Sequence, residues 1–162
     1  MKLLIASLLC LFTFQPISQP LVSDPAPPGP PNPYCITPPT SYPPFECEPD
    51  HSLDVDCALA CIAAHDACMR ISYTHACMSW NRANGQYVTC AKAAIAAYDA
   101  CMATAQTPEE KAACSNTLIT EISRCVEVLN FKRSAIALTI DRDIAACDAD
   151  YSACMPGCCH PN

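Results

Sequence analysis

Cysteine is the residue type with the most chemistry to offer in this sequence, because fifteen cysteines occur among 162 residues. Thiols at that density either pair as disulfides or hold a soft metal such as copper(I). Met1-Lys2 and the apolar run over residues 3–14 predict a secretory signal peptide, which we place at residues 1–20. Its removal discards Cys10 and leaves an even number of cysteines. Complete disulfide pairing in a secreted protein, extracellular or periplasmic, is therefore expected.

The spacing of ten of these cysteines predicts their partners. Paired from the outside inward, every pair of residue numbers sums to 215, and the mirror point lies between Thr107 and Pro108. An antiparallel pair of helices has this symmetry, since both helices rise by the same distance per residue. The five predicted disulfides are Cys57–Cys158, Cys61–Cys154, Cys68–Cys147, Cys90–Cys125 and Cys101–Cys114.

Four further cysteines lie outside the mirror pattern. The segment between Cys35 and Cys47 is rich in proline, and polyproline II of that length covers about 37 Å. A helix from Leu53 to Cys77 covers about 36 Å. The proline-rich segment can therefore lie along the first helix, which predicts the disulfides Cys35–Cys77 and Cys47–Cys159.

Two long helices are the elements that must position these cysteines. Residues 50–107 and 109–155 contain no proline and are rich in alanine, which is typical of helix. Thr107 and Pro108, followed by two glutamates, mark the start of the second helix. We therefore predict an all-α fold, a long antiparallel helical hairpin held by disulfides.

The chain divides into three parts by composition. After the signal peptide, residues 21–52 form a proline-rich arm, and residues 53–159 form the hairpin. Asn84-Gly85 leaves two shapes open for that hairpin. Equal gaps between cysteines on both helices favour a continuous rod, whereas a break at the glycine would fold the chain into a four-helix bundle.

The cysteine spacing resembles two known helical architectures. The outermost four mirror cysteines, spaced Cys-x3-Cys on each helix, resemble an α-hairpinin. The innermost four, spaced Cys-x10-Cys on each helix, resemble the twin-Cys coiled-coil-helix proteins. Both resemblances imply a helical hairpin, and neither implies a function.

A histidine and three aspartates lie in two segments that these cysteines bound, residues 61–68 and 147–154. Residues 61–68 read Cys-x3-His-Asp-x-Cys, and residues 147–154 read Cys-Asp-x5-Cys. This pair of motifs resembles the core helix pair of secreted phospholipase A2. The resemblance implies that His65 is a general base that activates water and that Asp148 orients its imidazole. It also implies that Asp66 helps to hold a calcium ion.

The sequence departs from that family at the calcium loop. The family needs a glycine-rich loop before the histidine, but the chain has three glycines and none lies between Pro30 and Asn84. Without calcium, nothing stabilises the negative charge that develops on the substrate oxygen (the oxyanion) during hydrolysis. The other interpretation of His65 is structural, as one half of a polar pair with Asp148 or Asp150 across the helix seam.

Composition narrows the remaining function classes. The formal net charge is −7 and no run of basic residues occurs, so nucleic acid is not an expected partner. No apolar run after the signal peptide is long enough to cross a bilayer. Four Cys-Met pairs could line a copper(I)-binding bundle, which is one alternative.

The sequence favours a secreted, disulfide-rich structural or interaction protein without catalytic activity or cofactor, whose extracellular partner is unknown. The second alternative is a phospholipase A2-like, calcium-dependent lipid hydrolase or an inactive relative of one.

Overall fold

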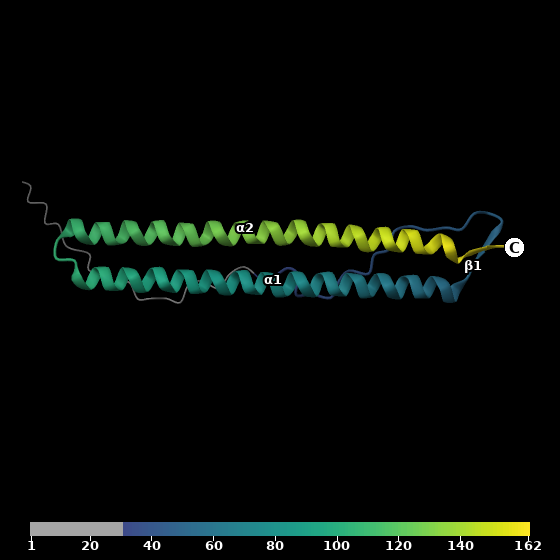
Figure 1. Ribbon diagram of the computed structural model, residues 1–162, viewed down its shortest axis with the longest axis horizontal. Helices are drawn as coiled ribbons and strands as arrows, with labels where there is room; N and C mark the ends of the chain where they lie inside the picture. The colour runs from purple at the N-terminus through teal and green to yellow at the C-terminus, as the bar shows by residue number, and fades with distance from the viewer. Residues whose placement is uncertain (1–30) are drawn as a thin grey trace, which may run out of the picture.

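Two long antiparallel helices make up most of the protein. The computed structural model describes residues 31–162, so the predicted signal peptide and the first part of the arm lie outside the described residues. Helix α1 spans Val55–Thr104 and helix α2 spans Pro108–Cys154. They lie side by side over their whole length (Figure 1). A short 3-10 helix, η1 (Met155–Cys158), continues α2.

Both helices are continuous, and together they form a rod. Helix α1 has 50 residues and α2 has 47, which correspond to lengths of about 75 Å and about 70 Å. Gly85 lies inside α1 without interrupting it. A glycine inside a helix costs only about 1 kcal/mol relative to alanine, and the rest of the helix outweighs that cost. The structure therefore has the continuous hairpin and not the four-helix bundle.

The turn between the helices is fixed by a capping box. The Thr107 hydroxyl accepts a hydrogen bond from the Glu110 backbone N–H at 3.2 Å, and the Glu110 carboxylate accepts one from the Thr107 N–H at 3.0 Å. Hydrogen bonds from the backbone N–H groups of Thr107 and Gln106 lower the pKa of Glu110. Pro108 occupies the first turn, where its missing N–H costs nothing.

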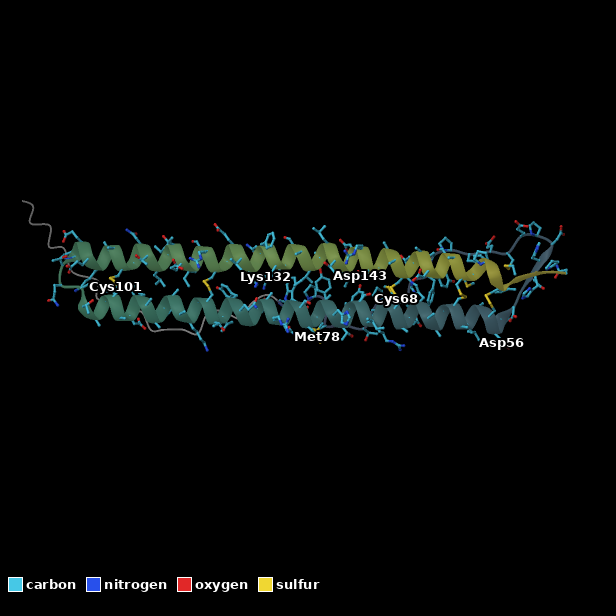
Figure 2. The ribbon with its side chains drawn as sticks, in the orientation of Figure 1. Asp56, Cys68, Met78, Cys101, Lys132 and Asp143 are labelled. Carbon is cyan, nitrogen blue, oxygen red and sulfur yellow. A yellow bond between two sulfur atoms is a disulfide. The ribbon has the colours of Figure 1, made fainter. Side chains whose placement is uncertain are left out.

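The seam between the helices is thin, and disulfides hold it. Its buried side chains are mainly alanines and cysteines, with a few larger residues such as Leu129 and Ile140. Small side chains allow the helices to approach, and the five disulfides across the seam have Cα–Cα distances of 5.4 to 5.9 Å (Figure 2). These five are the pairs that the mirror spacing predicts. Each contributes about 2–4 kcal/mol to stability, which offsets the small core.

The arm lies along α1 and ends in a small sheet. Disulfides Cys35–Cys77 and Cys47–Cys159 hold the arm at two points within its described part, as the length argument predicts. Strands β1 (His51–Leu53) and β2 (Cys159–Pro161) then pair antiparallel at the base of the hairpin. This sheet is an addition to the expected all-α fold. It forms where the Cys47–Cys159 disulfide holds two short extended segments side by side.

Candidate functional site

His65 and Asp148 meet across the seam. His65 Nε2 lies 2.9 Å from Asp148 Oδ1, so an Nε2–H donates to the carboxylate. The His65 side chain is only 1% exposed, whereas the Asp148 side chain is 43% exposed. The histidine thus lies inside the seam and its carboxylate partner reaches solvent. Of the two aspartates that the sequence leaves open as its partner, the structure selects Asp148.

The arm covers the histidine ring with a tyrosine. The Tyr42 ring centroid lies 5.3 Å from that of His65 and 5.7 Å from that of Tyr151. The ring centroid of Tyr151, in α2, lies 5.4 Å from that of His65, and the two rings meet edge to face. Three rings from the arm, α1 and α2 therefore pack together, and this packing explains the burial of His65. His65 Nδ1 is buried and has no hydrogen-bond partner among the described residues.

The same tyrosine engages the aspartate that follows the histidine. The Tyr42 hydroxyl donates a hydrogen bond to Asp66 Oδ1 at 2.9 Å. This bond, together with desolvation, raises the pKa of Tyr42. One Asp66 oxygen is thereby used within the protein. Within residues 31–162, Asp66 belongs to no group of three or more His, Cys, Asp or Glu side chains placed to hold a metal ion. The side chains around Asp66 therefore give no support to the calcium site that the phospholipase resemblance implies, and no calcium-dependent step is derived from them.

The cavity beside His65 is small. Its volume is about 100 Å³, and it is lined by His65, Asp150, Tyr151 and the disulfides Cys61–Cys154 and Cys68–Cys147. Pockets for small molecules usually have volumes of about 300–1,000 Å³. The cavity is therefore large enough for a few water molecules and too small for a phospholipid.

A second contact region lies farther along the arm. The Tyr34 ring packs edge to face on Trp80 at 5.7 Å, and the Arg133 guanidinium of α2 lies 4.6 Å from the centre of the Trp80 ring. Arg133 also donates a hydrogen bond to Asn84 Oδ1 at 2.8 Å. Trp80 thus joins the arm, α1 and α2 in the stretch of seam between Cys68–Cys147 and Cys90–Cys125, which has no disulfide.

Large apolar side chains of α2 are left in solvent. Phe131 is 76% exposed and Leu138 is 72% exposed, and Val128 is 48% exposed. Together with Ala135 they have the spacing of the a and d positions of a heptad and so share one helix face. We call these four residues the α2 stripe.

No cysteine thiolate is available for a soft metal in the part of the chain that the structure describes. The sulfurs of Cys57, Cys61 and Cys158 lie within 4.8 Å of one another, which would suit a thiolate cluster. All three belong to disulfides, however, as do the other cysteines of residues 31–162. This geometry gives no support to the copper-binding alternative.

Sequence reasoning identifies His65, Asp66 and Asp148 but misses the two tyrosines. A usable signal was present for Tyr42. Seven residues of polyproline II from Cys35 cover about 22 Å, equal to about fourteen helical residues, so Tyr42 reaches α1 within about one turn of His65. Tyr151 lies one turn before Met155 on the buried face of α2, in a hydrophobic cluster with Ala58 and Cys61.

Comparisons with known proteins leave this site to be interpreted from its own geometry. No family model matches the chain, and neither does any curated protein or solved structure. Within residues 31–162, no helix combines the length and the apolar character that a membrane span requires.

Proposed function

We propose that the protein is a secreted, non-catalytic structural or interaction protein, a rigid extracellular rod that holds or spaces its partners. The observation that carries this proposal is the covalent fixing of one extended shape. Disulfides join the helices near both ends, at Cys57–Cys158 and at Cys101–Cys114, and two more hold the arm. Such a density of disulfides is typical of extracellular proteins.

The site around His65 supports the non-catalytic part of this proposal. A general base needs a nitrogen that can reach a substrate or an attacking water. His65 Nδ1 is buried, Tyr42 covers the ring, and the adjacent cavity is about 100 Å³. The same atoms serve as a polar and aromatic cluster that fixes the arm to the hairpin.

The α2 stripe supports the interaction part of the proposal. Exposed apolar residues at heptad spacing fit the apolar face of a partner helix. Phe131 and Leu138 are the largest exposed side chains of the stripe. We place the partner contact there, on the rigid central part of α2.

An assay for lipid hydrolysis tests the non-catalytic assignment. The oxidised protein is incubated with mixed phosphatidylcholine–phosphatidylglycerol vesicles in calcium, and fatty-acid release is measured beside the His65→Gln variant. We expect equal background release from both proteins. Calcium-dependent release that the substitution abolishes would overturn the proposal and favour the phospholipase alternative. The 2.9 Å contact between His65 and Asp148 is the observation that makes this alternative worth testing.

Chemical cross-linking in extracellular fluid tests the interaction assignment. The double variant Phe131→Ser, Leu138→Ser should lose the cross-linked complexes that the wild-type chain forms. Ile119→Ser is the matched control, because Ile119 is 63% exposed on α2 but lies off the stripe. Equal loss in both variants, or in neither, would contradict a contact at the α2 stripe.

A further inference from the structure

Two disulfides lie against each other at the base of the hairpin. Cys57 and Cys61 are one turn apart on α1, and their partners Cys158 and Cys154 have the same spacing on the other side of the seam. Because of this stacking, Cys61 Sγ lies 3.6 Å from Cys158 Sγ, although these two atoms are not bonded to each other. A sulfur of one disulfide is therefore close to a sulfur of the next.

The four cysteine residues differ in their exposure to solvent. Cys61 is 2% exposed and Cys158 is fully buried. Cys154 is exposed and Cys57 is partly exposed. The two sulfurs in non-bonded contact thus belong to the two buried cysteines, and each is bonded to a cysteine that is exposed or partly exposed.

We propose that this sulfur quartet is a thiol-exchange site that takes a low-molecular-weight thiol. The thiolate attacks Cys154 Sγ, forming a mixed disulfide there and breaking the Cys61–Cys154 bond. The Cys61 thiolate then attacks Cys158 Sγ across the 3.6 Å contact, forming Cys61–Cys158 and breaking Cys57–Cys158. Cys57 leaves as a thiolate and takes a proton. Two disulfide bonds break and two form, so these two exchange steps need no oxidant or reductant.

The position of Cys57 favours its role as the final thiolate. Its backbone N–H donates to the capping side chain of Asp54 at 3.1 Å, which places Cys57 in the first turn of α1. Backbone N–H groups in the first turn of a helix favour negative charge. The hairpin stays closed throughout, because Cys61–Cys158 replaces the lost bridges and Cys68–Cys147 remains. The outcome is a modified Cys154 and an accessible Cys57 thiol.

Peptide mapping of the wild-type chain tests the proposal. The protein is treated with excess free cysteine at mildly alkaline pH, quenched in acid, and its thiols are labelled with N-ethylmaleimide. We expect the cysteine adduct on Cys154, maleimide on Cys57 in equal amount, and a Cys61–Cys158 cross-linked peptide. An adduct on Cys154 with maleimide on Cys61 would show that the second step does not occur and would overturn the proposal.

The opposite end of the hairpin is an internal control. Cys101 is exposed and its partner Cys114 is 3% exposed, so the added thiol can attack Cys101 as it attacks Cys154 in the first step. The next disulfide, Cys90–Cys125, is eleven residues away, or about 16 Å. An adduct on Cys101 should therefore leave maleimide on Cys114 alone.

A single substitution tests the inner step without any added thiol. Cys57→Ser leaves Cys158 unpaired beside the Cys61–Cys154 disulfide, so Cys158 can attack Cys61 and release Cys154. We expect N-ethylmaleimide to label mainly Cys154. In the matched variant Cys101→Ser the label should stay on Cys114. Label confined to Cys158 in Cys57→Ser would contradict the exchange.

Discussion

Tyr42 of the arm donates a hydrogen bond of 2.9 Å to Asp66 of α1. Disulfides at Cys35 and Cys47 fix the arm on both sides of Tyr42, so its hydroxyl is held in place before the bond forms. The bond uses the carboxylate that the phospholipase resemblance assigns to calcium. The ring of the same tyrosine lies over His65. One residue of the arm therefore contacts two of the side chains to which the phospholipase resemblance gives a role, His65 and Asp66.

We expect Tyr42→Phe to reduce the dependence of stability on pH in alkaline solution. The bond to Asp66 raises the pKa of Tyr42 in the folded protein. The unfolded state then ionises first, so this contribution to the free energy of unfolding is intact below pH about 10. It is lost as the pH rises from there through the raised folded pKa. Phenylalanine keeps the ring and removes the ionisation.

The measurement is denaturant unfolding of the oxidised protein between pH 8 and pH 11, with short exposure to the alkaline buffers. The pKa of Tyr34 is also raised, chiefly by burial. Tyr34 therefore leaves some dependence of the free energy of unfolding on pH in both the wild type and the Tyr42→Phe variant. Tyr98→Phe is the control, because the Tyr98 hydroxyl makes no hydrogen bond within the described residues. The idea is refuted if Tyr42→Phe and Tyr98→Phe show the same pH dependence as the wild type.

The hairpin was predictable because disulfides between antiparallel helices fix the spacing of the cysteines along the sequence. Equal rise per residue forces partner cysteines on antiparallel helices to mirror one another about the turn. Thr107 and Pro108 mark that turn by independent chemistry, hydroxyl capping and a missing N–H. The sequence left two shapes open at Gly85, because a single glycine costs too little to decide between a rod and a bundle.

The site was only partly predictable. Motif spacing brings His65 and Asp148 together, because His65 lies three residues before Cys68, Asp148 lies one residue after Cys147, and these two cysteines pair across the seam. The arm has no periodic apolar pattern, so its sequence does not say which side chains face α1. The sheet formed by β1 and β2 also leaves no pattern, because three-residue strands are too short to alternate visibly.

Two leucines of α2 should respond very differently to truncation. Leu129 is 6% exposed in the seam and Leu138 is 72% exposed on the α2 stripe. Leu129→Ala removes buried methyl groups and should lower the free energy of unfolding by about 2–3 kcal/mol. Leu138→Ala should change it by less than about 0.5 kcal/mol. Guanidinium unfolding with the disulfides intact measures both, and a large loss from Leu138→Ala would mean that the stripe is already covered.

Fluorescence should report release of the arm, because the chain contains one tryptophan. Trp80 packs on Tyr34, which lies next to Cys35 in the arm. Replacing both Cys35 and Cys77 with serine frees that end of the arm, admits water to the indole and should shift its emission to longer wavelength. The matched control replaces Cys101 and Cys114, far along the rod, and should leave the emission unchanged. An unshifted spectrum in the first variant would show that the contacts of Trp80 hold the arm without the disulfide.

The Asp148 carboxylate should matter to folding through its hydrogen bond to His65 and not through its charge alone. Asp148→Ala leaves His65 Nε2 buried without its acceptor, and a buried polar group left unsatisfied costs about 1–3 kcal/mol. Asp148→Asn retains an acceptor oxygen for the Nε2–H and should cost clearly less. Asp150→Ala is the control, because Asp150 is exposed and makes no hydrogen bond or ion pair within the described residues. Equal unfolding free energies for the alanine variants at positions 148 and 150 would show that the pair across the seam does not stabilise the fold, and the role assigned to His65 would have to change.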